Sequence, residues 1–345
     1  MTILKGDKTL SLGQVVSEVL EVKKKKGVRW KKIGKTIALI YILYLIASLS
    51  IIYVSTNKTV KNLSLYTLDI KRGIKNLLAY NLTIAMQLFE NASKHLNEAY
   101  LNFKRTEILR FTNILLTIWY FISSKQKERL VAINEIFIIS EFMANGSQNI
   151  VTSLNWTIDA VNLAVKSERF LDAINTIEKA NSKALEAVSN FGQAIDLLDI
   201  DYTKLSEKER NATIALNNTL QEMFLLAKHL NIITYSMKQL IIAIESSKKA
   251  YDEMSSEETN FNNLRTYSLN LSIALTEFEE RKINETAKEF FTDLVYCMCM
   301  AYKWLLNIQN ALNLSIRSEE TSPYKEWILE NYTLLCAEFE YLTEI

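Results

Sequence analysis

The chain has 345 residues, of which 49% are hydrophobic, and a net charge of +1. This is enough apolar material for the core of one large or two ordinary domains. Seven glycines and one proline exclude the glycine-rich loops that bind nucleotide phosphates, and three cysteines are too few for a disulfide-based fold.

The small net charge hides an uneven distribution. Residues 1–35 carry ten basic and three acidic residues, whereas residues 36–345 carry 30 basic and 36 acidic residues. By the positive-inside rule, residues 1–35 are predicted to be a cytoplasmic basic tail. Its cluster is suited to anionic lipid headgroups, and this position beside an apolar stretch leaves no need to invoke nucleic acid as a partner. The cluster consists of Lys23, Lys24, Lys25, Lys26, Arg29, Lys31, Lys32 and Lys35.

Residues 11–22 of this tail predict a short amphipathic helix. Ser11 can serve as its N-cap, and apolar residues follow at i, i+3 and i+4 spacing. Such a helix would lie on the inner leaflet or dock on a partner. The alternative is a tail that is disordered at its front and only sets the orientation in the membrane.

Residues 36–55 are predicted to be a single transmembrane signal anchor. The 18 residues from Ile37 to Val54 contain no charge, and as a helix they span about 27 Å, close to the hydrocarbon thickness of a bilayer. A cleaved signal peptide is the competing interpretation, but its apolar region is only about 7–15 residues long. We therefore expect a protein of the cell membrane, with its N-terminus in the cytoplasm and residues 56–345 outside.

Asparagine supports the same orientation. Residues 1–56 contain none and the rest of the chain contains 29, of which 12 begin an Asn-x-Ser/Thr triplet, about three times the chance expectation of roughly four. The triplets predict an N-glycosylated extracellular domain; the alternative is an asparagine-rich chain that is never glycosylated. The candidate sites are Asn57, Asn62, Asn81, Asn91, Asn145, Asn155, Asn211, Asn217, Asn270, Asn284, Asn313 and Asn331.

Residues 56–345 are predicted to be an all-α, coiled-coil-like bundle of long helices. Apolar residues recur at alternating spacings of three and four, for example through residues 78–103 and 216–244, as in helices that pack lengthwise. Additional apolar residues widen these stripes, which favours a multi-helix bundle. No stretch shows the alternation of a β-strand.

Polar clusters predict where these helices end. Residues 63–74 are expected to extend the transmembrane helix as a stalk, and a last helix to begin at Thr321 or Ser322 and to run to about Leu342. Residues 223–244 and 290–306 are apolar but contain charges, so they are expected to be core helices and not further membrane spans. The predicted breaks lie at residues 102–106, 123–127, 144–148, 166–169, 199–206, 255–260 and 317–323.

Five polar residues carry further expectations. Asn181 and Thr234 fall on apolar stripes, where a buried Asn can fix the register of helices; the alternative is a half-exposed residue near a helix end. Asn145 is expected in the turn at residues 144–148. Asn270 and Asn284, 14 residues apart, are expected on one solvent-facing side of a helix.

The sequence shows no pattern of catalytic chemistry. His95 and His229 are isolated, so we predict no metal site and no cofactor. Cys336 could form a disulfide with Cys297 or Cys299, with free buried thiols as the alternative.

One acidic pair, Asp199 and Asp201, forms part of a wider pattern. A basic tail, an anchor and an outer Asp199-Ile200-Asp201 resemble the layout of membrane-anchored glycosyltransferases. The chain lacks the strands and glycine turns of their nucleotide-binding domain, so we predict no catalytic residues and no enzyme.

The sequence thus predicts a membrane-anchored, N-glycosylated surface protein whose helical ectodomain acts through protein–protein contacts, in a structural, adhesion or assembly role. Its partners would be other surface proteins or further copies of itself. The alternative is a receptor or sensor subunit whose ectodomain binds a ligand and whose short tail engages a cytoplasmic partner.

Overall fold

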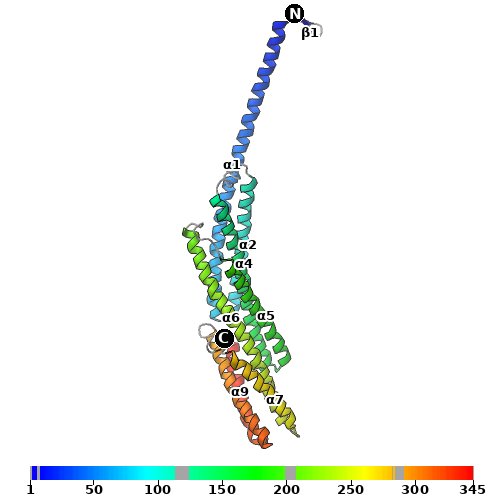
Figure 1. Cartoon of the computed structure of the whole chain (residues 1–345), viewed down its shortest axis with the longest axis vertical. Coiled ribbons are helices and arrows are strands. Elements are labelled where there is room, and N and C mark those ends of the chain that lie inside the picture. Colours follow the sequence, from blue (N-terminus) through cyan, green and yellow to red (C-terminus); the bar gives the residue numbers. More distant parts are fainter. Residues whose placement is uncertain are drawn as a thin grey trace. The chain divides into compact units, whose positions relative to one another are not determined.

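The computed structural model describes residues 2–5, 8–112, 124–198, 207–281, 283 and 291–344. A short antiparallel hairpin of β1 (Thr2–Lys5) and β2 (Lys8–Ser11) precedes the helices. Every other element among the described residues is helical (Figure 1), so the prediction of an all-α chain is confirmed there. The helices are α1 (Leu12–Leu78), α2 (Leu82–Thr112), α4 (Ser124–Val165), α5 (Phe170–Asp196), α6 (Glu207–Met254), α7 (Phe261–Glu280), α9 (Thr292–Ser318) and α10 (Ser322–Glu344).

The chain divides into two compact units, which we call the anchor unit (residues 1–61 and 99–123) and the bundle unit (residues 62–98 and 124–345). In the anchor unit, the Thr59 hydroxyl donates a hydrogen bond to the carbonyl oxygen of Ala99 at 3.4 Å, joining α1 to α2. The buried residues of this helix pair are mostly small, which allows close approach of the two backbones. They are Ser48, Ser55 and Thr59 on α1 and Ala99, Phe103 and Thr106 on α2.

The bundle unit has a continuous hydrophobic core. Helix α5 lies between α4 and α6, which it contacts on either side, and α9 pairs with α10. The buried line of α5 is rich in alanine, so neighbouring helices pack close to it. It consists of Ala173, Ile177, Ala180, Ala184, Ala187, Phe191 and Ala194.

Two buried glycines mark the closest contacts between helices of the bundle unit. A Cβ atom on Gly146 of α4 would lie 2.7 Å from the ring of Phe191, and one on Gly73 of α1 would overlap the ring of Phe89. The polar cluster at residues 144–148, predicted to be a break, is therefore a contact within an unbroken α4. The prediction was wrong because small residues serve close packing as well as turns.

The other predicted breaks have mixed outcomes. Those at residues 166–169, 255–260 and 317–323 are confirmed, as is a last helix starting at Ser322. The break at residues 102–106 is wrong, since α2 runs through it. Helix α4 begins at Ser124, inside the break predicted at residues 123–127, whereas residues 199–206 lie outside the described residues.

Two turns were not predicted. One, at Ala79–Asn81, separates α1 from α2, and the other is at Phe291, immediately before α9. Each contains a residue other than glycine in the left-handed region, Tyr80 with φ of 57° and Phe291 with φ of 59°. Because the chain turns there without glycine or proline, the usual signal of a turn is missing.

Helix α1 continues through the region expected to be a stalk, but it is packed. Tyr66, Ile70 and Leu77 are buried in the bundle unit. The tyrosine hydroxyl donates a hydrogen bond to the carbonyl oxygen of Ser140 on α4 at 3.0 Å. This part of α1 is therefore a core helix of the bundle unit.

Candidate functional site

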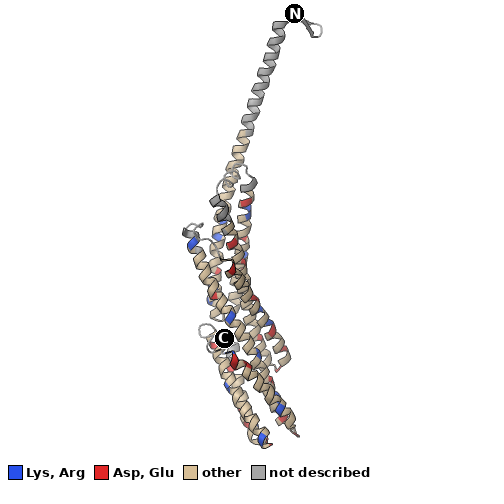
Figure 2. Cartoon of the chain, viewed as in Figure 1, with Lys and Arg blue, Asp and Glu red and all other residues tan. Residues whose placement is uncertain are grey.

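Among the described residues, one helix is long and apolar enough to cross a membrane, the part of α1 from Ala38 to Leu78. In its most apolar window of 18 residues, only 11% of the residues are buried. Residues 38–54 carry no charge and are tan in Figure 2, whereas charges of both signs are interspersed over the bundle helices. The exposed side chains of this stretch include Leu39, Ile40, Ile42, Leu43, Ile46, Leu49, Ile51 and Val54.

Two hydroxyl groups of this part of α1 donate to carbonyl oxygens of the preceding turn. The Ser50 hydroxyl donates to the carbonyl oxygen of Ile46 at 2.9 Å, and the Thr56 hydroxyl donates to that of Ile52 at 2.8 Å. In a bilayer no water is present to satisfy such groups, so bonds to the preceding turn lower the cost of burying them in lipid.

The basic cluster of residues 23–35 belongs to helix α1, and the structure describes only the backbone of these residues. Asp199-Ile200-Asp201 and Asn284 also lie outside the described residues.

Asn181 and Thr234, predicted on separate apolar stripes, contact each other. The Thr234 hydroxyl on α6 lies 2.9 Å from the side-chain oxygen of Asn181 on α5 and 3.0 Å from the carbonyl oxygen of Asn231, so one proton is shared between two acceptors. Thr234 is fully buried. Asn181 is half-buried. A polar pair between two helices disfavours sliding of one along the other.

The three cysteines are free thiols in the structure. Burial raises the pKa of Cys336 to about 11, with further contributions from Glu340 and Glu168. Burial likewise raises the pKa of Cys297 to about 11, helped by Glu338 and Asp293. Both groups are therefore held as neutral, weakly nucleophilic thiols.

A charged cluster links the turn between α4 and α5 to α6. The Lys248 ammonium lies 3.1 Å from a Glu168 carboxylate oxygen and 3.6 Å from an Asp252 carboxylate oxygen. Glu168 itself has φ of 51°. In this way a left-handed turn residue is tied to the neighbouring helix by a partly exposed ion pair.

The histidines and a surface hollow complete the described polar sites. Nε2 of His95 lies 3.6 Å from a carboxylate oxygen of Asp69, and His229 belongs to α6. No group of three or more metal-ligating side chains occurs among the residues that the structure describes. An open hollow between α4 and α5 is lined by Trp156, Asp159, Asn162, Leu163, Ser167, Thr176 and Lys179.

The candidate glycosylation sites differ in exposure. Asn331 is 4% exposed; its amide donates to the carbonyl oxygen of Trp327 at 2.8 Å and accepts from the amide of Asn307 at 3.1 Å. Asn62, Asn155, Asn217 and Asn313 are half-buried. The exposed candidates are Asn57, Asn81, Asn91, Asn145, Asn211 and Asn270.

Two expectations about these asparagines are corrected. Asn145 is exposed, but in the middle of α4 and not in a turn. Helix α7 ends at Glu280, so Asn270 and Asn284 do not share one helix.

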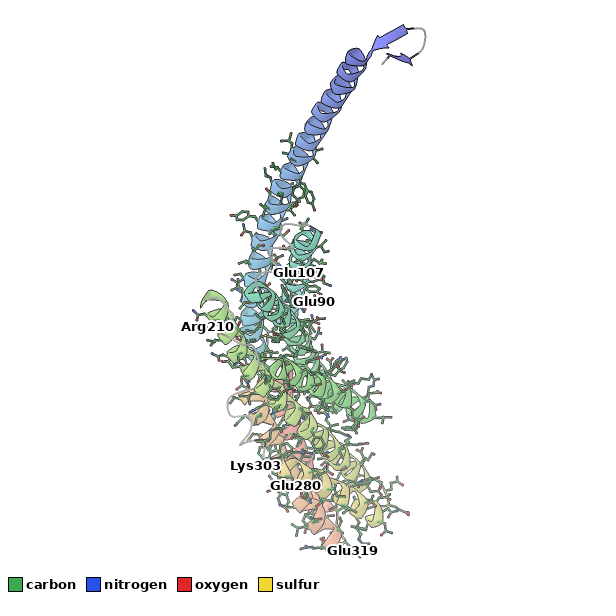
Figure 3. The ribbon with its side chains drawn as sticks, turned by 45° about the horizontal axis from the view of Figure 1, so that its top comes forward. Glu90, Glu107, Arg210, Glu280, Lys303 and Glu319 are labelled. Carbon is green, nitrogen blue, oxygen red and sulfur yellow. The ribbon has the colours of Figure 1, made fainter. Side chains whose placement is uncertain are left out.

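Charged side chains project from the surface in Figure 3, where Glu90 on α2, Lys303 on α9 and Glu319 beyond its end are labelled and are exposed.

Comparison of the chain with family models, with characterised proteins and with solved structures finds no match.

Proposed function

We propose that this chain is a single-pass membrane protein of the cell surface, with residues 1–35 in the cytoplasm and an N-glycosylated helical bundle outside that acts through protein contacts. One observation carries the proposal. An uncharged stretch of α1 about one bilayer long exposes nearly all its apolar side chains, and lipid is the medium in which such a surface is stable.

The charge distribution supports the orientation. Eight basic residues lie within 13 positions before the uncharged stretch, whereas only Lys58 and Lys61 follow it closely. The side with more lysine and arginine stays in the cytoplasm.

Exposed apolar side chains on the bundle unit support a role in protein contacts. Leu269 and Ile273, one turn apart on α7, are 59% and 51% exposed, and Tyr296 on α9 is also exposed. Large apolar side chains grouped on a soluble surface are typical of contact sites.

The orientation is tested on intact cells with a membrane-impermeant amine reagent and with deglycosylation. We expect lysines of residues 56–345 to be modified, those of residues 1–35 to be protected, and the mass to fall after removal of N-glycans. Modification of the tail alone would contradict the proposal.

The contact role is tested by chemical crosslinking on cells. We expect crosslinked products to weaken when Leu269→Lys and Ile273→Lys are combined and to persist with Leu185→Lys, a matched aliphatic-to-lysine change on α5. Leu185 is 50% exposed. Unchanged products in both variants would exclude this α7 surface as the contact site.

One observation favours the receptor alternative. Helix α1 runs without a break from Leu12 to Leu78, so one helix connects the tail with the bundle unit. Deletion of residues 1–22 discriminates the two: a sensor loses its output while the surface level stays unchanged, whereas a purely structural component keeps its activity.

A further inference from the structure

The hollow between α4 and α5 combines one indole ring with polar side chains from both helices. Its volume is about 450 Å³, within the range of about 300–1,000 Å³ that small-molecule sites have. Trp156 lines it from α4 and is half-buried, so its ring is held by the helix pair and is still partly accessible. Asp159 lies beside it on α4, and Thr176 and Lys179 face the hollow from α5.

Three of these polar side chains have unused hydrogen-bonding capacity. Within the described part of the chain, no hydrogen bond or ion pair engages the side chains of Asp159, Asn162 and Lys179. The carboxylate accepts hydrogen bonds, the ammonium donates them, and the amide does both. An anionic ligand would be repelled by Asp159 and a cationic one by Lys179, so the hollow suits a neutral ligand.

A saccharide is the neutral ligand that matches this lining. Hydroxyl groups around the rim of a sugar ring both donate and accept hydrogen bonds, as the side chains on either side of the hollow require. The faces of the ring carry C–H groups, which pack on the negative face of an indole.

A glycan acceptor triplet lies at the edge of this hollow. It consists of Asn155, Trp156 and Thr157. Asp159 and Asn162 follow Asn155 by four and seven residues, so they lie within about 40° of it around the helix axis. Helical side chains lean toward the N-terminus of their helix, which brings both of them back toward Asn155. A sugar attached to Asn155 therefore begins within one turn of the hollow.

The covalent link compensates for the openness of the hollow. A ligand on a short flexible tether has an effective concentration on the order of millimolar. A site whose dissociation constant is about equal to that concentration is about half occupied by its own glycan. Free sugars at lower concentrations leave the same site largely empty.

We propose that the hollow binds the first sugars of an N-glycan attached to Asn155. The inference rests on the proposed N-glycosylation of residues 56–345. The bound glycan bridges the last turns of α4 and the first turns of α5, on either side of the turn at residues 166–169. It also covers this part of the bundle surface, which is then closed to protein partners.

The test compares the release of individual glycans from the folded full chain, produced in eukaryotic cells and kept in detergent. Peptide N-glycosidase converts a glycosylated asparagine to aspartate, which mass spectrometry detects site by site. Asn145, an exposed position on the same helix, is the reference site. We expect release at Asn155 to be several-fold slower than at Asn145.

Variants separate binding in the hollow from the partial burial of Asn155 itself. Asp159→Ala and Trp156→Leu each remove a side chain of the hollow and are expected to speed release at Asn155 several-fold. Asp159 is exposed, so its variant leaves the core unchanged. Glu141→Ala is the matched control, because it removes an exposed carboxylate of α4 outside the hollow. It should leave the rate at Asn155 unchanged.

The outcomes distinguish this inference from the proposed function. An unchanged release rate at Asn155 in Asp159→Ala would overturn the inference and leave the function intact. Glycans at Asn145 and Asn270 but none at Asn155 would have the same meaning. A chain without any glycan would contradict the proposed glycosylation as well.

A second measurement identifies the source of the sugar. Eukaryotic N-glycans begin with N,N′-diacetylchitobiose, and this disaccharide is added to the glycosylated chain and to its Asn155→Gln variant. Saturation-transfer NMR is expected to show contact only with Asn155→Gln, whose hollow is unfilled, and to lose it when Asp159→Ala is added. Equal contact with both chains would mean that the hollow takes free sugar and not its own glycan. No contact with either would overturn the saccharide site itself.

Discussion

The uncharged stretch of α1 and residues 223–244 of α6 are both rich in apolar residues, but among the described helices only α1 is apolar enough to cross a membrane, and the surroundings of the two stretches differ. Leu43 and Ile46 of α1 are more than half exposed, whereas Leu230 and Ile233 of α6 are fully buried. Residues 223–244 contain Lys228 and Lys238, and Lys238 forms a partly exposed ion pair with Glu178 of α5 at 2.7 Å. An apolar helix with one charged side suits a protein core, and one without any charged side suits lipid.

Truncating one isoleucine in each stretch gives the largest expected contrast. Ile233→Ala removes fully buried side-chain atoms and is expected to lower the free energy of unfolding by about 2–5 kcal/mol. Ile46→Ala, in a side chain that is mainly exposed, should change it by less than about 0.5 kcal/mol. Chemical denaturation of the full chain in detergent, followed by circular dichroism, measures both. Equal losses would mean that protein, and not lipid, covers this part of α1.

A pair of glycines sharpens the distinction between tight and open packing. Gly146→Ala forces a methyl group against the Phe191 ring and is expected to destabilise the bundle by about 1–3 kcal/mol. Gly192→Ala is the control, since its Cβ would meet Phe224 at an ordinary 3.9 Å, and it should stabilise the helix by about 0.5–1 kcal/mol. The same denaturation curves provide the measurement; destabilisation of both variants to the same extent would refute the close contact.

The hydrogen bond between Thr234 and Asn181 is a specific contact of α6 with α5. Thr234→Val keeps the side-chain shape but leaves the Asn181 oxygen without its donor, at an expected cost of about 1 kcal/mol. Thr219→Val on the same helix removes a hydroxyl that bonds only within its own turn and should cost less than about 0.5 kcal/mol. A cycle that adds Asn181→Leu isolates the pair; a coupling energy of zero would show that the two residues act independently.

Alkaline pH gives the smallest expected effect. Cys336 has a pKa of about 11 in the fold against an ordinary 9.0, so folding favours its protonated form. This contribution to stability is complete below pH 9.0 and is lost as the pH rises to about 11, because the unfolded chain releases the proton first. Denaturation at pH 8 and pH 10.5 compares the chain with Cys336→Ala. We expect the variant to lose less stability over this interval; identical losses would contradict the raised pKa.

Regular spacing made the helices predictable, and the absence of turn residues made two of their ends unpredictable. The apolar stripes of α2, α5 and α6 follow from spacings of three and four, which packing against neighbours preserves. Tyr80 and Phe291 adopt left-handed conformations that cost an ordinary residue about 1–2 kcal/mol. Tertiary packing supplies that energy, and residue type alone does not reveal it.

The spacing of apolar residues along the sequence does not reveal which residues of two neighbouring helices contact each other. Asn181 and Thr234 were each predicted on a stripe, but their contact depends on the relative register of α5 and α6. The burial of Asn331 has the same origin, since its triplet is indistinguishable in sequence from that of exposed Asn270. The exposed apolar face of α1 needed no such knowledge, because it depends only on an uninterrupted run.

Because Asn331 is buried, its glycosylation would depend on whether the glycan is added before or after the surrounding helices pack. The side-chain amide of Asn331 is occupied by Trp327 and Asn307 once α10 has docked on α9. A glycan can enter only before docking, so occupancy at this asparagine would measure the competition between oligosaccharide transfer and closure of the final helix. The fraction of molecules that carry it would report how quickly the C-terminal hairpin assembles in the cell.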